Sequence, residues 1–117
     1  MQRWKWFTDV ESKGLVDDLM FKLDRMRGLL RRFIRITDGF CMKPHHLPNS
    51  AHSTGHAADC TIRAEDDKRP FTDEEKAEIA WAAGAAGFRR IGIYDRHFHV
   101  DVDKTKPQDT VWTGASK

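Results

Sequence analysis

The sequence predicts a small α+β domain in which an antiparallel sheet is flanked by helices. Two stretches have helical signals, residues 15–32 and 72–87, and each is followed by short stretches in which apolar and polar residues alternate as in strands. Helices and strands arranged along the chain in this order are typical of α+β folds. A chain of 117 residues is long enough for one hydrophobic core, so we expect a single domain over residues 1–117.

The first helix is predicted over residues 15–32 because apolar side chains recur there at steps of three and four. These side chains are Leu15, Val16, Leu19, Met20, Leu23, Met26, Leu29 and Leu30. The basic residues between them predict that the opposite face is solvated. Before the helix come Trp4, Trp6 and Phe7, and we expect this aromatic lead-in to pack as a lid on the core.

The second helix has a start signal at Thr72, which can cap it, while Glu75 three residues later completes a capping box. Gly87 is typical of the position just after a helix, so we expect the helix to end near it. Trp112 lies in the tail and is expected to seal the core. The predicted strands span residues 33–37, 55–62, 91–94 and 98–102. Residues 63–69 are mostly charged and are expected to form a surface excursion before the second helix.

Composition excludes several classes of protein. Hydrophobic residues make up 39% of the chain and charged residues 32%, as in ordinary globular proteins. The net charge of +2 is too small to argue for nucleic acid, and no apolar run approaches the roughly 20 residues that span a bilayer. The N-terminal residues lack the apolar core of a signal peptide, so we expect synthesis in the cytoplasm. Cys41 and Cys60 are too few for a disulfide scaffold. We expect a monomer without nucleic-acid or membrane partners.

Two polar stretches carry the candidate chemistry. Residues 50–59 read Ser-Ala-His-Ser-Thr-Gly-His-Ala-Ala-Asp, which provides an imidazole and a carboxylate separated by a glycine turn. Residues 95–101 read Asp-Arg-His-Phe-His-Val-Asp and provide imidazoles in a strand-like run. Two His and one carboxylate around a divalent metal, with one position open for water, is the composition of a catalytic zinc site. Surface histidines in a polar loop are the alternative.

The pattern Ser-x-His-x-x-Gly-x-Ala-x-Asp over residues 50–59, followed by a His-x-Asp strand, resembles the zinc D-alanyl-D-alanine carboxypeptidase family. Relatives in this family include the vancomycin-resistance dipeptidases, phage endolysin peptidases and the hedgehog domain. The resemblance extends over residues 6–112 and implies a zinc site on the sheet. His52, Asp59 and His99 match the positions of the family's metal ligands, so Zn²⁺ is the expected cofactor.

The chain departs from the family pattern at two supports of catalysis. Relatives commonly carry Glu or Asp three residues before the last His ligand, where this chain has Arg96. Asp95 and His97 are therefore the candidates for handling protons, and a His-x-His in some related peptidoglycan peptidases favours His97. At the end of the first strand the family often has Gly-aromatic-Arg, where residues 39–41 read Gly-Phe-Cys. Lys43 or a nearby His could take the place of the missing Arg.

The resemblance implies a zinc metallopeptidase that hydrolyses D-amino-acid-containing stem peptides or cross-links of bacterial peptidoglycan, as a carboxypeptidase or an endopeptidase. Ser50 is expected to contact the substrate, and the enzyme would reach the cell wall after release, in the manner of a phage or prophage endolysin. A zinc-binding module of the same fold without catalysis is the alternative. A mononuclear iron oxygenase uses the same ligand types, but its His-x-Asp pair usually precedes a distant His, whereas residues 99–101 come last here.

Overall fold

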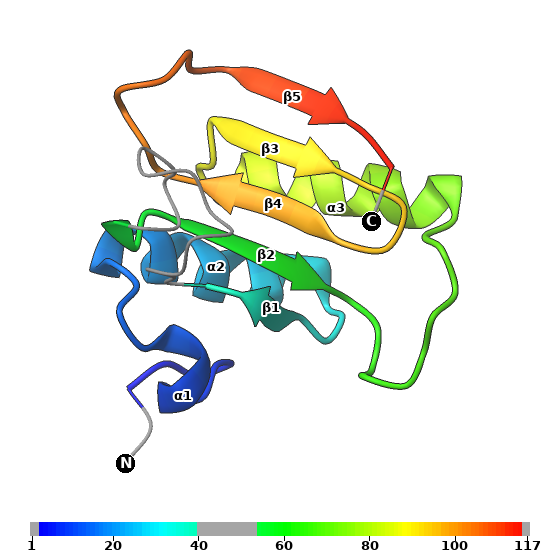
Figure 1. The fold of residues 1–117 in the computed structure, drawn as a ribbon, viewed down its shortest axis with the longest axis horizontal. Coiled ribbons are helices and arrows are strands. Elements are labelled where there is room, and N and C mark those ends of the chain that lie inside the picture. The colour runs from blue at the N-terminus through cyan, green and yellow to red at the C-terminus, as the bar shows by residue number, and fades with distance from the viewer. Residues whose placement is uncertain (1–2, 40–53, 116–117) are drawn as a thin grey trace.

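Five strands form one mixed sheet in the computed structural model of the protein, which describes residues 3–39 and 54–115. The predicted ligand His52 and the predicted substrate contacts Lys43 and Ser50 lie outside these ranges. In chain order the elements are α1 (Asp9–Ser12), α2 (Asp17–Leu30), β1 (Arg35–Asp38), β2 (Ala57–Thr61), α3 (Asp73–Ala85), β3 (Arg90–Ile93), β4 (Phe98–Asp101) and β5 (Thr110–Thr113). They make a small single α+β domain with the strand order β1-β2-β4-β3-β5 (Figure 1).

The sheet is antiparallel except at one edge, where β5 runs parallel to β3. The prediction of a wholly antiparallel sheet is therefore wrong at this edge, and β5 itself was not predicted. After β4 the chain does not turn straight back, because residues 102–109 step across to the far side of β3 (Figure 1). Arg89 fixes the entry to β5. Its guanidinium binds both carboxylate oxygens of Asp109 at 2.7 and 2.6 Å, and its carbonyl accepts from the Thr110 N–H at 2.9 Å.

The predicted start and end of α3 are confirmed. The Thr72 hydroxyl accepts from the Glu75 N–H at 3.1 Å, and the Glu75 carboxylate accepts from the Thr72 N–H at 2.9 Å. Gly87 follows the helix with a φ of +106°, a left-handed conformation that glycine adopts without steric cost. The glycine therefore lets the chain leave α3 and enter β3 within a few residues.

The N-terminal half differs in its boundaries from the prediction. The short helix α1 was not predicted, although Thr8 and Glu11 form the same capping box that marks α3. Helix α2 begins at Asp17, two residues later than expected, and ends at Leu30 because Arg31 adopts a left-handed conformation with φ 58°. The predicted helix and the observed one share their buried face.

The hydrophobic core lies between α2 and α3 and the face of the sheet that these two helices cover (Figure 1). Trp4 and Phe7 are buried in it, as expected for the aromatic lead-in. Trp6 is not, since 39% of it is exposed and the Arg27 guanidinium lies 4.3 Å from its ring. The expectation that Trp112 seals the core is also wrong, because this side chain is half-buried on the opposite face of the sheet. The inward-facing strand residues are Ala58, Cys60, Ile91, Ile93, Phe98 and Val100, and Ile34 joins them from just before β1.

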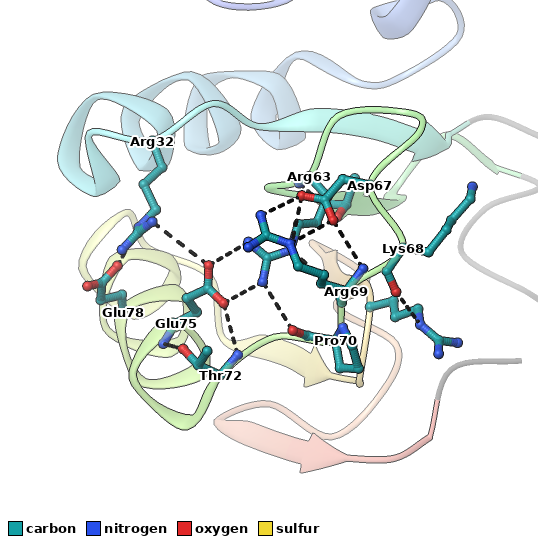
Figure 2. A network of polar contacts seen from close by, with 11 residues as sticks. Arg32, Arg63, Asp67, Lys68, Arg69, Pro70, Thr72, Glu75 and Glu78 are labelled. Atoms are coloured by element: carbon teal, nitrogen blue, oxygen red, sulfur yellow. Dashed lines mark hydrogen bonds and ion pairs between the residues drawn. The ribbon is translucent and has the colours of Figure 1, made fainter.

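Arg63, Thr72 and Glu75 form a group of side chains that we call the loop cluster (Figure 2). This cluster holds the connection from β2 to α3 in place. The Arg63 guanidinium binds the two Glu75 oxygens at 2.7 and 2.6 Å. It also donates to the carbonyls of Arg69 at 3.3 Å and Pro70 at 3.1 Å. Residues 63–69 were expected to be a surface excursion, yet the side chain of Arg63 is only 11% exposed.

Within residues 3–39 and 54–115, no helix has both the length and the apolar character needed to cross a bilayer.

Candidate metal centre

The candidate site lies on the face of the sheet that α2 and α3 do not cover. Side chains alternate between the two faces of a strand, so Asp59 points away from the core that contains its neighbour Cys60. Asp59 on β2 and His99 on β4 are direct cross-strand neighbours. Gly92 on β3 and Trp112 on β5 continue the same row. Four strands therefore contribute to one line of residues across the sheet.

His99 lies between two carboxylates. Its Nδ1 is 3.0 Å from Asp59 Oδ1, and its Nε2 is 2.7 Å from Asp101 Oδ2. The side chain of His99 is 15% exposed and that of Asp101 is 1% exposed. Asp101 is thus a buried acceptor for the imidazole and does not face solvent.

Asp101 is held in turn by groups on two neighbouring segments. Arg90 Nε lies 2.9 and 3.0 Å from its two oxygens, and the Asp103 N–H donates to it at 3.1 Å. Burial by itself raises the pKa of Asp101, but the hydrogen bonds from His99 and Asp103 and the charge of His99 outweigh burial and lower it. An ionised acceptor beside Nε2 places the proton of a neutral His99 there, which leaves the Nδ1 lone pair directed at Asp59.

The charges around His99 favour a cation at this point of the sheet. Burial lowers the pKa of His99, but its hydrogen bonds to Asp101 and Asp59 outweigh burial, so the pKa is raised. Asp59, Asp101 and Arg90 together carry a formal charge of −1 when His99 is neutral. The two carboxylates favour a proton on the imidazole, and they would favour a bound cation in the same way.

The donor atoms present fit part of a zinc site. Imidazole nitrogen and carboxylate oxygen are both zinc ligands, and two ligands on a tetrahedral zinc ion stand roughly 3.4 Å apart. The observed separation of 3.0 Å between His99 Nδ1 and Asp59 Oδ1 is close to that value. Within the described ranges no group of three or more His, Cys, Asp or Glu side chains could hold a metal. The third predicted ligand, His52, lies outside these ranges.

The two predicted proton-handling residues point in different directions from the β3–β4 turn. The His97 ring stacks on Tyr94 with 4.4 Å between ring centroids and 4° between ring planes. Burial lowers the pKa of His97, and the charge of Asp59 partly opposes this effect. Asp95 instead reaches toward α3, where its Oδ1 lies 3.7 Å from Lys76 Nζ. His97 therefore shares the electrostatic environment of Asp59, and Asp95 has a partner on the helical side.

Arg96 stands where relatives of the resembled family commonly carry an acid. Its Nε donates to the carbonyl of Lys68 at 2.9 Å, so the side chain runs along the β2–α3 connection. The bond attaches the β3–β4 turn to that connection. This hydrogen bond gives a structural reason for a basic residue at position 96.

Arg35 is a residue on this face that sequence reasoning did not single out. It is paired with Thr61 across the β1–β2 ladder, two positions along β2 from Asp59 and on the same face. Its Nε is buried, and no group in the described part of the chain accepts a hydrogen bond from it. A buried donor without an acceptor is uncommon in folded proteins. Arg35 is therefore a candidate to bind an oxygen of a ligand.

A hollow of about 540 Å³ lies next to the start of β2 and the end of β4. His56 and Thr54 line it from the start of β2, and residues 102–105 line it from the segment after β4. His56 Nδ1 lies 2.8 Å from the Thr54 hydroxyl. Neither Asp59 nor His99 lines the hollow, so the candidate metal centre is beside this hollow rather than at its base.

Comparison of the chain with protein-family models gives no match, and comparison with the sequences of curated proteins gives none either.

Proposed function

We propose that this protein is a zinc metallopeptidase that hydrolyses peptide bonds in the D-amino-acid-containing stem peptides or cross-links of bacterial peptidoglycan. The observation that carries the proposal is the pair of His99 and Asp59, whose zinc-ligand atoms face each other at 3.0 Å on the open side of the sheet. The buried acceptor behind His99 supports it further, because ligand imidazoles in metal sites are commonly oriented by a carboxylate. The sequence pattern of residues 50–59 supplies the substrate class.

The residues of the chain divide into those that hold the ion and those that orient its ligands. His52, Asp59 and His99 would hold zinc, and Asp101 with Arg90 would orient His99. When bound, zinc supplies Lewis-acid polarisation of the peptide carbonyl and a nucleophilic water near neutral pH. His99 must be neutral to bind, so the ion and the proton compete for the same imidazole.

His97 is the better of the two candidates for handling protons. It lies two residues before His99, just ahead of β4. Its pKa is lowered mainly by burial, which favours a neutral imidazole able to accept a proton. Asp95 is engaged with Lys76 at 3.7 Å. His97→Ala is expected to keep zinc and to lose roughly 10²–10⁴ in turnover, while Asp95→Asn has the smaller effect.

At residues 39–41 the chain lacks the arginine that the resembled family often has there. A cation is therefore needed from elsewhere to bind the substrate carbonyl. Arg35 can provide it, since it lies on the same face of the sheet as Asp59 and its Nε has no acceptor among residues 3–39 and 54–115. Lys43 remains the other candidate, as predicted from the sequence. Arg35→Lys and Lys43→Ala separate these two assignments, because the residue that binds the carbonyl is the one whose change lowers kcat/KM with zinc still bound.

The decisive test is cleavage of purified Gram-negative sacculi, analysed by mass spectrometry of the released fragments. Zinc-loaded protein should create new free termini within the stem peptide or its cross-link and leave the glycan strands intact. A chelator should abolish cleavage and added zinc should restore it. His99→Ala should be inactive, whereas His56→Ala, a histidine of the same region that bonds Thr54, should keep its activity.

A zinc-binding module without catalysis is the second candidate function. It is favoured by Arg96, which occupies the position of the usual acid and bonds to the Lys68 carbonyl. Folded protein that binds one zinc per chain but leaves sacculi and synthetic stem peptides intact over a broad pH range would establish this function in place of hydrolysis.

A further inference from the structure

Strand β5, which the sequence did not predict, carries a residue that organises the candidate site. Trp112 on this strand lies over Gly92 of β3, where a Cβ atom would come within 2.6 Å of the indole ring. The absence of a side chain at residue 92 is thus what allows the indole to lie flat on the sheet. In this position the ring centroid of Trp112 is 5.5 Å from that of His99.

The indole of Trp112 also forms a hydrogen bond to Tyr94, which lies beside the second histidine of this face, His97. Its Nε1–H donates to the Tyr94 hydroxyl at 2.7 Å. Gly114, two residues after Trp112, passes so close to the Tyr94 ring that a Cβ atom would come within 2.8 Å of it. The end of β5 therefore fixes the Tyr94 side chain by a hydrogen bond at the hydroxyl and by close packing at the ring edge.

Tyr94 in turn contacts His97. The two rings are parallel within 4° and their centroids are 4.4 Å apart, the geometry of a stacked pair. The backbone brings them together, because the Tyr94 N–H donates to the His97 carbonyl at 2.9 Å across the β3–β4 turn. A ring held on one face can no longer rotate freely, so the direction of the His97 nitrogens depends on where Tyr94 lies.

We propose that Trp112 is a positioning residue for His97: its hydrogen bond to Tyr94 holds the phenol ring stacked on the imidazole and so sets the orientation of that imidazole beside the metal centre. The part of this inference that concerns catalysis rests on the proposed function, in which His97 handles protons. The part that concerns orientation does not depend on any activity. Trp112 has no contact with substrate in this scheme, and its effect on His97 passes through Tyr94.

The first test measures orientation directly by NMR of the zinc-loaded protein. A stacked phenol ring shifts the His97 ring protons upfield, and the hydrogen bond displaces the Trp112 indole N–H signal. Tyr94→Phe should move the indole signal toward that of a free indole, and Trp112→Phe should reduce the upfield shift of His97. Val111→Ala is the matched control, because Val111 is the exposed neighbour on the same strand and points to the other face.

The second test uses turnover of a stem peptide. Trp112→Phe and Tyr94→Phe should each lower kcat roughly tenfold with KM little changed, a smaller loss than the roughly 100-fold that a misplacement of 1 Å can cause. The double variant should be no worse than either single one, because both remove the same hydrogen bond. Zinc content should remain one per chain in all variants.

The outcomes separate this inference from the proposed function. If no variant and no wild-type protein cleaves stem peptides, the proposed function fails, and the NMR signals still decide whether Trp112 orients His97. If Trp112→Phe only lowers the melting temperature and leaves the His97 signals as in the wild type, the inference is overturned. Additive losses of kcat in the double variant would overturn it as well.

Discussion

Two clusters of this domain pair an arginine with a buried carboxylate, and they differ in what lies between the charges. In the loop cluster, Glu75 meets Arg63 at 2.6 and 2.7 Å and takes its remaining hydrogen bond from the Thr72 N–H. In the second, which we call the face cluster and which comprises Arg90, Asp101, His99 and Asp59, an imidazole separates two carboxylates. The first pairs one arginine with one carboxylate, whereas the second places one arginine and one imidazole among two carboxylates.

The difference indicates what each cluster does. A buried pair with all its hydrogen bonds made holds two segments together and has no further ligand to bind, as expected of a cluster that fixes the β2–α3 connection. A cluster in which two carboxylates flank an imidazole brings together the atom types that bind metal ions. We therefore assign the loop cluster to stability, and the proposed function assigns the face cluster to ligand binding.

The largest effect is expected from His99→Ala in the face cluster. The substitution removes a proposed zinc ligand and leaves Asp59 without its neighbour, so zinc affinity should fall by more than about 100-fold, the upper end of the loss for a residue that only orients a ligand. Competition with a chromophoric chelator measures the affinity. Retention of one tightly bound zinc per chain would contradict the assignment of His99.

Arg63→Ala should have the next largest effect, on stability alone. It leaves the Glu75 carboxylate buried without its cation and frees two carbonyls, so we expect a loss of about 3 kcal/mol in the free energy of unfolding. Urea denaturation of the zinc-free protein measures it. Arg69→Ala is the control in the same segment, since that side chain is 75% exposed and bonds Asp67, and its stability should remain near that of the wild type.

Helices α2 and α3 and their buried faces were predictable from the sequence, but strand β5 at the edge of the sheet was not. Thr72 and Glu75 predicted the start of α3 because a capping box is local, and the same spacing at Thr8 and Glu11 could have revealed α1. Strand β5 has four residues and pairs in parallel with β3, so its partner is twenty residues away and no hairpin turn marks it.

The candidate site was predictable where motif positions fall on regular strands. Asp59 and His99 are neighbours on the predicted face because alternation along β2 and β4 fixes the direction of their side chains. The position of Trp112 on the open face was not predicted, since it depends on the parallel edge of the sheet. Arg90 was not singled out, since its partner Asp101 lies on the neighbouring strand β4. Arg63 was misassigned to the surface because its partner Glu75 lies across a loop whose path the sequence does not specify.

Asp101→Asn should weaken zinc binding without abolishing it. The amide removes the negative charge that orients and polarises His99, and changes of this kind typically cost 10–100-fold in metal affinity. We expect about a tenfold loss, because an amide oxygen can still accept from Nε2. The measurement is the same chelator competition as for His99→Ala. A loss as large as that of His99→Ala would instead make Asp101 a ligand.

The loop cluster should give the protein a pH dependence that the Glu75→Gln variant lacks. The hydrogen bond from Arg63 holds the pKa of Glu75 below its ordinary range, against the opposing effect of burial. Since the folded pKa lies below the unfolded value of about 4.3, the stabilisation is complete above that pH and is lost as the pH falls through the folded pKa. Denaturation between about pH 5 and pH 3 should show a steeper fall for the wild type than for Glu75→Gln. Parallel pH curves would contradict the assignment.

The smallest effect is expected from Arg32→Ala, which tests whether an exposed ionic contact with Glu75 contributes measurably to the free energy of unfolding. Arg32 Nη1 lies 3.9 Å from a Glu75 oxygen, and its Nε bonds Glu78 at 2.6 Å (Figure 2). Its side chain is 41% exposed, against 11% for Arg63, so water and salt screen its charge.

Exposed pairs of this kind contribute about 0.5 kcal/mol, and we expect Arg32→Ala to lose that amount at low ionic strength and almost nothing in about 1 M salt. The loss for Arg63→Ala should change little with salt, because its partner is buried. Urea denaturation at the two ionic strengths compares them. If Arg32→Ala cost as much as Arg63→Ala, the stability of the connection would arise from the whole acidic start of α3 and not from the single buried pair.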